Sequence, residues 1–206
     1  MAIKADREYR NLGNFEIKAD ETKKRAVGYA STFEPYKLAT IDGVDYFERI
    51  APTAFENADM TDVVFLRDHT GPVLARTKNG TVTLSVNENG LWTETDLSKT
   101  EAARAMQEDI EVGNYSQMSF SFVVEADHFD RETRPRVIDS FKKIYDVSAV
   151  AFPANPGAEI GISARDYFNG VIEMEKAERL EREIRERQAK KIKLMLEVTK
   201  NDNAGN

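Results

Sequence analysis

Apolar and polar residues alternate over residues 116–124, where the sequence reads SQMSFSFVV. In an extended strand, one face would carry the apolar side chains Met118, Phe120, Phe122 and Val124. Ser119 points to the opposite face, on a rigid element that would present a nucleophile well. The same pattern also fits an ordinary half-buried strand whose small polar residues face water, so neighbouring segments have to decide between the two interpretations.

Several other segments combine short apolar runs with turn residues at their ends, as strands do. The predicted strands are residues 15–17, 25–33, 46–50, 63–66, 73–86, 91–97 and 137–152. Residues 20–24 would form a hairpin loop, and Asn89-Gly90 is a strong hairpin signal between two alternating runs. Residues 34–45 and the highly charged residues 125–136 are predicted to be loops.

Helical patterns are fewer. A short helix is predicted over residues 53–58 after Pro52, and a longer one begins at Ser98, which has capping-box spacing to Glu101. The apolar stripe of the longer helix would consist of Ala102, Ala105, Met106 and Ile110. From about residue 171, glutamates precede basic residues at i,i+4 spacing, which predicts a solvated helix.

This order of elements indicates a mainly β fold of the α+β class, with flanking helices and a charged C-terminal helix. A β-barrel is expected because an open sheet would leave its edge strands unprotected. We predict a flexible segment over residues 1–13, one domain over 14–165, a helical tail over 166–200 and a disordered end over 201–206.

The amino-acid composition excludes several classes of functional site and partner. The chain is 41% hydrophobic, enough for a real core, and it contains no cysteine, which excludes disulfides, cysteine nucleophiles and thiolate metal sites. Its net charge of −7 argues against nucleic-acid binding. There is neither a membrane-spanning apolar run nor a signal peptide, so we expect a soluble protein that folds inside a cell.

Three residues could together form a serine-hydrolase site. His69 follows the buried strand at 63–66, Ser119 lies on the central strand, and Asp146 lies on a later one. The order His, Ser, Asp differs from that of familiar serine proteases, but such triads are recognised by geometry and not by order. Serine needs a base to remove its proton, and the base needs an acid to orient it. The competing nucleophiles are Ser116, Ser121 and Ser148.

Over residues 14–163 the chain resembles the prohead proteases of tailed bacteriophages, capsid-maturation serine proteases related to herpesvirus assemblin. The segments that carry the resemblance read GYASTF (28–33), IAPTAF (50–55), VFLRDH (64–69), VLART (73–77), NGL (89–91), MSFSF (118–122), DVSAV (146–150) and PANP (153–156). Each segment is short, but their common order makes the resemblance fairly specific.

The resemblance implies that His69 is the general base, Ser119 the nucleophile and Asp146 the acid, a position where many relatives have glutamate. His128 is an alternative third member, because the herpesvirus enzymes use a second histidine. Thr70, Ala75 and Ser121 depart from the family pattern. Ser121 matters most, since glycine at that position would leave room for an oxyanion donor.

The resemblance further implies a serine endopeptidase that cleaves phage capsid and scaffold proteins, and itself, in the prohead interior or host cytoplasm. It implies a herpesvirus-protease-like barrel, no metal or other cofactor, and a homodimer by analogy. No nucleic-acid or membrane partner is expected. The alternative is a catalytically silent assembly protein that binds scaffold or capsid through its C-terminal helix.

Overall fold

The structure is a computed structural model that describes residues 7–16, 18–20, 25–151 and 162–204. The chain divides into two compact units, Met1–Arg165 and Asp166–Asn206. The first unit contains two sheets and helix α1, and the second contains most of helix α2. The mainly β class with flanking helices is therefore confirmed.

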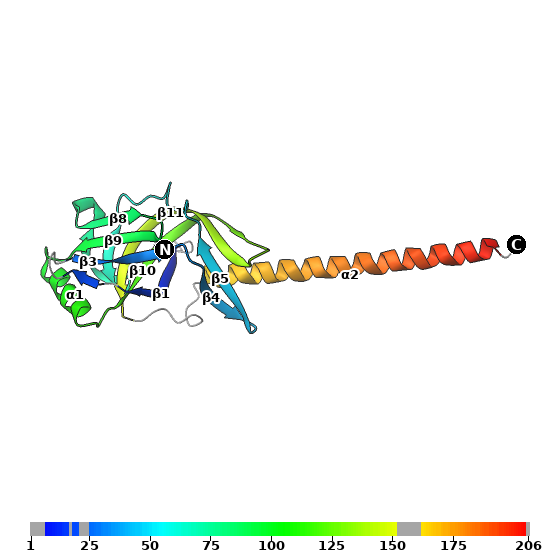
Figure 1. Ribbon diagram of the computed structural model, residues 1–206, viewed down its shortest axis with the longest axis horizontal. Coiled ribbons are helices and arrows are strands. Elements are labelled where there is room, and N and C mark those ends of the chain that lie inside the picture. Colours follow the sequence, from blue (N-terminus) through cyan, green and yellow to red (C-terminus); the bar gives the residue numbers. More distant parts are fainter. Residues whose placement is uncertain (1–6, 17, 21–24, 152–161, 205–206) are drawn as a thin grey trace, which may run out of the picture. The chain divides into compact units, whose positions relative to one another are not determined.

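The larger sheet of the described residues is built around a long antiparallel pair of strands, β10 and β11 (Figure 1). Antiparallel β1 pairs with β10 on one side, while β5 and β6 run parallel to β11 on the other. The strands of this sheet are β1 (Glu8–Glu16), β10 (Gln117–Phe129), β11 (Pro135–Val150), β5 (Val44–Ile50), β4 (Tyr36–Ile41), β6 (Val64–Arg67) and β7 (Thr70–Arg76).

The smaller sheet has the order β2-β3-β9-β8. Its strands are β2 (Lys18–Asp20), β3 (Arg25–Thr32), β9 (Gly90–Asp96) and β8 (Val82–Val86), and a 3-10 turn, η1 (Thr77–Asn79), precedes β8. Strand β3 contacts both β1 and β10 of the larger sheet. Among the described residues the strand pairs form these two sheets and not one closed ring, so the barrel remains a prediction.

The apolar face predicted for the central strand is buried. Met118, Phe120 and Phe122 have no exposed surface and pack in the core, where the rings of Phe120 and Phe122 contact that of Phe141. The opposite face is buried as well, since Ser119 is only 2% exposed. The interpretation of this strand as half-buried, with serines facing water, is therefore wrong.

Residues 34–45 are not a loop, as predicted, but form most of the hairpin β4–β5. Its two-residue turn is Asp42-Gly43, and both residues have positive φ angles, 51° and 79°. Asp-Gly is a preferred sequence for such a turn, because aspartate and glycine tolerate the left-handed backbone. The signal was present, but the polar strand residues on either side concealed it.

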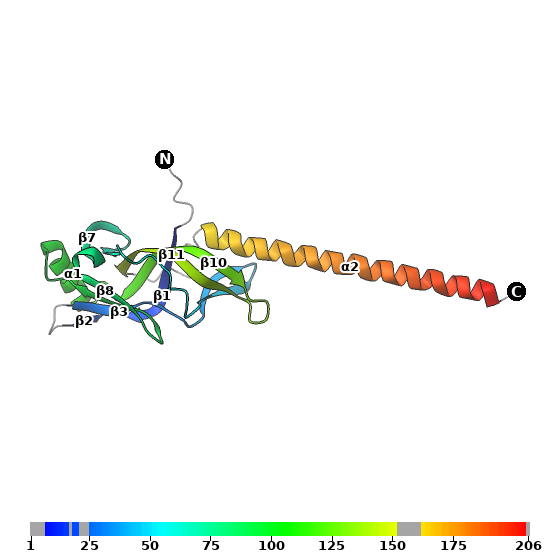
Figure 2. The same cartoon turned by 90° about the horizontal axis from the view of Figure 1, so that it is seen from above.

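Residues 125–136 are likewise not a surface loop. Strand β10 continues to Phe129 and β11 begins at Pro135, so the excursion is a short turn (Figure 2). In Figure 2, α1 and β7 lie at the opposite end of the unit from the tip of this hairpin. The pairing has several register shifts, which explains why the apolar alternation fades along the segment.

Three smaller predictions also need correction. Residues 53–58 form turns and not a helix. Helix α1 spans Glu101–Glu111, and Thr100 caps it by accepting a hydrogen bond from the Ala103 amide, in place of the predicted Ser98–Glu101 box. Its buried apolar residues are Ala103, Met106 and Ile110, whereas Ala102 and Ala105 are exposed. The hairpin loop predicted at residues 20–24 lies mostly outside the described residues.

Helix α2 spans Ile162–Ala204, so it reaches into the segment 201–206 that was predicted to be disordered. Most of its described side chains from residue 173 onward are exposed. Ion pairs at i,i+4 spacing join Arg179 to Glu183 and Glu181 to Arg185, as expected on a solvated helix surface. No helix of the described residues is long and apolar enough to cross a membrane.

Candidate active site

Ser119 lies near the start of β10, between β1 and β11. Its pairing partners are Asn11 on one side and Ser148 on the other. The apolar residues before and after it, Met118 and Phe120, anchor the strand in the core and therefore fix the direction of the serine side chain.

His69 occupies a two-residue turn between β6 and β7. Arg67 pairs with Thr70, and both turn residues, Asp68 and His69, have positive φ angles of 47° and 58°. The amide of Asp68 donates to the carbonyl of Ala149 at 3.0 Å, which fastens the turn to β11. Asp and His are among the residues that tolerate this backbone conformation.

Asp146 lies on β11, where it pairs with Ser121 of β10 and with Val64 of β6. Its side chain has no exposed surface. Burial by itself would raise the pKa of this carboxyl group. The hydrogen bond and charge of His69, together with hydrogen bonds from Ser121 and Ser148, outweigh it and hold the pKa below the ordinary value.

These three residues from distant parts of the chain form one continuous array. The imidazole of His69 lies between the other two: Nδ1 is 2.5 Å from Asp146 Oδ1, and Nε2 is 2.6 Å from Ser119 Oγ. The imidazole is partly accessible, at 18% exposure. The structure thus brings together the three residues that the sequence singled out.

Ser121 and Ser148, the two buried serines named as competing nucleophiles, surround the aspartate. Ser148 Oγ donates to Asp146 Oδ1 at 2.9 Å and lies 3.3 Å from His69 Nδ1, and Ser121 donates to Asp146 Oδ2. Both hydroxyl groups therefore orient the carboxylate. Ser116, the third alternative, is exposed and lies before the start of β10.

Strand β1 and Arg7, which directly precedes it, add contacts that the sequence did not predict. Ser119 Oγ donates to the carbonyl oxygen of Arg10 at 2.8 Å, and the ring of Tyr9 packs edge-on against His69 with centroids 4.8 Å apart. The guanidinium of Arg7 forms an ion pair with Asp146 and donates to Ser121 Oγ at 2.6 Å. Part of the segment 1–13, for which the sequence predicts flexibility, thus lies in β1, where long-range pairing with β10 holds residues whose charge suggests solvation.

His128, the alternative third member, is not part of this array. It lies on β10 toward the hairpin tip, is exposed, and contacts Asp139 Oδ2 through Nδ1 at 2.7 Å. No group of three or more His, Asp or Glu residues in the described part of the chain is arranged to hold a metal ion.

A hydroxyl group, an imidazole and a buried carboxylate joined in this order on a β scaffold define the arrangement of a serine hydrolase. Comparison with known proteins agrees. The family described as Caudovirus prohead serine protease matches residues 13–173, which is most of the chain. The chain therefore belongs to the caudovirus prohead serine protease family. No curated protein and no solved structure matches it significantly.

Proposed function

We propose that this protein is a serine endopeptidase of phage prohead maturation, with Ser119 as nucleophile, His69 as general base and Asp146 as the acid. The observation that carries this proposal is the placement of the His69 imidazole within 2.6 Å of Ser119 Oγ and 2.5 Å of Asp146 Oδ1. Family membership supports the same assignment.

The reaction follows from the chemistry of the three groups. As Ser119 Oγ attacks a peptide carbonyl carbon, its proton passes to His69 Nε2, and Asp146 stabilises the imidazolium through Nδ1–H. The imidazolium then protonates the leaving amine as the peptide C–N bond breaks, which leaves an acyl-serine. Water attacks the acyl-serine, again with His69 as base, and releases the second product and the free Ser119 hydroxyl.

Prohead assembly suggests the substrates. We infer that the enzyme cleaves the capsid and scaffold proteins of its phage inside the assembling prohead, and that it also cleaves itself. The family description supports the setting. Substrates, self-cleavage and a homodimeric state are parts of the proposal that experiment has to establish.

Co-expression with the capsid precursor tests the assignment. Ser119→Ala should abolish processing of the precursor, while Ser116→Ala, which removes an exposed neighbouring hydroxyl, should process it normally. Mass spectrometry of both purified variants would report self-cleavage and its sites. Continued processing by Ser119→Ala, with the same cleavage sites, would rule the assignment out.

A second candidate function is a binding role for α2. Its described apolar side chains include Leu180 and Ile184, which are 59% and 45% exposed. We infer that this helix docks on the capsid or scaffold protein. Deletion of the helix should then abolish co-purification with the capsid protein. A serine-reactive phosphonate separates this role from catalysis, because only an enzyme is labelled at Ser119.

A further inference from the structure

Strand β1 lies against the nucleophile as a bound peptide would. It pairs antiparallel with β10, with Arg10 opposite Phe120 and Asn11 opposite Ser119. Many proteins bind an extended peptide as an additional strand on a sheet edge, where main-chain hydrogen bonds supply affinity and side-chain pockets supply specificity. The edge of β10 beside Ser119 is such an edge, and β1 occupies it.

The contact with Ser119 indicates which residue of the occupant corresponds to the cleavage point. The hydroxyl donates to the carbonyl oxygen of Arg10 at 2.8 Å. A hydroxyl group has one proton, so this proton is not shared with His69 while β1 is in place. Strand β1 is therefore a resting occupant of the edge, and Arg10 holds the position of the residue on the acyl side of a scissile bond.

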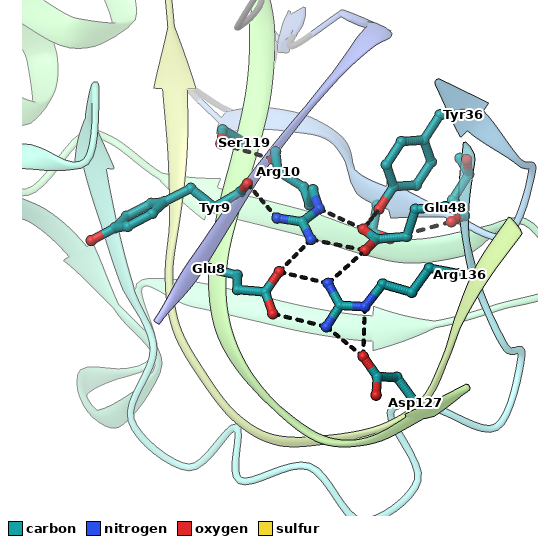
Figure 3. A network of polar contacts seen from close by, with 10 residues as sticks. Glu8, Tyr9, Arg10, Tyr36, Glu48, Ser119, Asp127 and Arg136 are labelled. Atoms are coloured by element: carbon teal, nitrogen blue, oxygen red, sulfur yellow. Dashed lines mark hydrogen bonds and ion pairs between the residues drawn. The ribbon is translucent and has the colours of Figure 1, made fainter. Parts of the chain in front are cut away.

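The side chain of Arg10 lies on the face of β10 opposite Ser119, where it is buried in a network of charged side chains (Figure 3); we call this site the arginine pocket. Its guanidinium binds the Glu48 carboxylate through two parallel contacts, Nε to Oε1 at 2.5 Å and Nη2 to Oε2 at 2.8 Å. Glu48 has no exposed surface, and it also accepts a hydrogen bond from the hydroxyl of Tyr36. The guanidinium carbon lies 5.2 Å from the ring centre of Phe122. These contacts match the charge and the planar guanidinium of an arginine.

A second site binds Glu8, the residue two positions before Arg10. Glu8 lies on the same face of β1 as Arg10, because side chains alternate along a strand. Arg136 binds the Glu8 carboxylate: its Nη1 atom lies 2.8 Å from Glu8 Oε2, and its Nη2 atom lies 3.0 Å from Glu8 Oε1. Arg136 also contacts Glu48 at 3.0 Å and Asp127 at 2.5 Å, as Figure 3 shows. Between these two residues, Tyr9 faces His69.

Glu48 and Arg136 lie on β5 and β11, whereas Glu8 and Arg10 lie on β1. Arg10 pairs with Glu48 and Glu8 with Arg136, and Arg10 and Glu8 also pair with each other. A neutral side chain in place of Arg10 would leave a buried carboxylate without its main partner, which is costly. A peptide that replaces β1 is therefore selected for the same two charges.

We propose that the β10 edge beside Ser119 is the substrate-binding site, and that it selects an extended peptide with an acidic residue, any residue, and then an arginine immediately before the scissile bond. Glu48 recognises the arginine, Arg136 recognises the acid, and β1 is a built-in occupant that substrate displaces. Arginine is favoured over lysine because the contact with Glu48 is bidentate. The inference rests on the proposed function of Ser119.

A pair of matched covalent probes tests whether the site prefers arginine immediately before the scissile bond. Both are diphenyl phosphonates with the sequence acetyl-Glu-Tyr-X, in which the phosphonate replaces the carbonyl of X; X is arginine in one and its neutral isostere citrulline in the other. The full-length protein is incubated with each, and labelling of Ser119 is followed by mass spectrometry. The arginine probe should label about 10-fold faster or more, as expected for a hydrogen bond between charged groups.

Protein variants test whether Glu48 causes the preference for the arginine probe over the citrulline probe. Glu48→Gln should bring the ratio of the two labelling rates close to one, while Glu94→Gln, which alters an exposed carboxylate of the smaller sheet, should keep the wild-type ratio. Arg10→Ala empties the pocket of its resident side chain and should accelerate labelling by the arginine probe several-fold. Replacing glutamate by glutamine in the arginine probe should slow labelling without any change to the protein.

The outcomes separate this inference from the proposed function. Equal labelling by the arginine and citrulline probes, in the wild type and in Arg10→Ala, would overturn the selection while leaving Ser119 as a nucleophile. A preference for arginine that survives in folded Glu48→Gln would overturn the role of Glu48. Failure of Ser119 to react with either probe, and with a small fluorophosphonate in both proteins, would instead overturn the proposed function.

Discussion

His69 and His128 form the same contact with an aspartate in different surroundings. The Nδ1 atom of each lies close to a carboxylate, 2.5 Å from Asp146 in one case and 2.7 Å from Asp139 in the other. Asp146 is fully buried, whereas Asp139 is 41% exposed, and the Nε2 atom of His69 lies 2.6 Å from the Ser119 hydroxyl. A His–Asp pair therefore becomes a candidate catalytic element only when buried strands fix it against a nucleophile.

The largest expected effect comes from removing each imidazole. His69→Ala should lower the rate of peptide cleavage by roughly 10⁴- to 10⁶-fold, because the serine loses its base. His128→Ala should leave the rate within about two-fold, since surface changes away from the site have small effects. Cleavage of a capsid-derived peptide measures both. A large loss in His128→Ala would break the comparison and restore His128 as a candidate member of the site.

The second-largest effect on the cleavage rate is expected from removing the carboxylate beside each histidine. Asp146→Asn should reduce the cleavage rate by up to about 10⁴-fold, because the imidazole loses its orientation and the imidazolium its counter-charge. Asp139→Asn, the matched control, should have no measurable effect on the rate. If the two variants lost activity equally, burial of Asp146 would not be what distinguishes the pairs.

Acid should destabilise strand β1, which covers His69, because protonation of Glu8 removes its ion pairs. Burial by itself would raise the pKa of Glu8, but the charges and hydrogen bonds of Arg10 and Arg136 lower it from 4.5 to about 2. A lowered pKa contributes stability that is present above pH 4.5 and is lost as the pH falls toward 2. The contribution is on the order of 3 kcal/mol.

Urea unfolding at a series of pH values between 6 and about 2.5 measures this contribution. The free energy of unfolding of the wild type should fall steeply below pH 4.5, while that of Glu8→Gln should start lower and fall less. Glu94→Gln is the control, because its carboxylate is exposed in an ion pair with Arg25. Identical slopes for Glu8→Gln and wild type would show that Glu8 does not titrate in this way.

The smallest effect is expected at Arg7, which lies beside the buried carboxylate of the His69 pair. Its guanidinium forms an ion pair with Asp146 and stacks 4.5 Å from the ring centre of Tyr145. Arg7→Gln should remove a cation that competes with His69 for the Asp146 carboxylate. Labelling of Ser119 by a small fluorophosphonate should then accelerate several-fold.

The matched control for Arg7 is Arg25→Gln, which removes an exposed guanidinium of the smaller sheet. It should leave the labelling rate unchanged. A slower rate in Arg7→Gln would mean that this arginine holds Asp146 in position and does not compete with His69.

Local patterns indicated the strands and turns that carry the candidate site. Alternation around Ser119 predicted a strand with a buried apolar face, and the apolar run before His69 predicted a buried strand that ends in a turn. Both depend on interactions between residues close together in sequence, which a single sequence records directly. The resemblance to prohead proteases then selected Ser119, His69 and Asp146 from the other polar residues.

Long-range pairing decided what local patterns could not. Arg7, Glu8 and Arg10 read as a solvated charged segment, and only the docking of β1 on β10 gives each of them a buried partner. Asp42-Gly43 carried a turn signal, but the flanking strands are fixed by pairing with β11 through β5. The sequence by itself thus determined which residues could react, because reactivity is a property of the side chain. Tertiary structure alone decided which charges surround them, because burial and pairing depend on segments far apart in the chain.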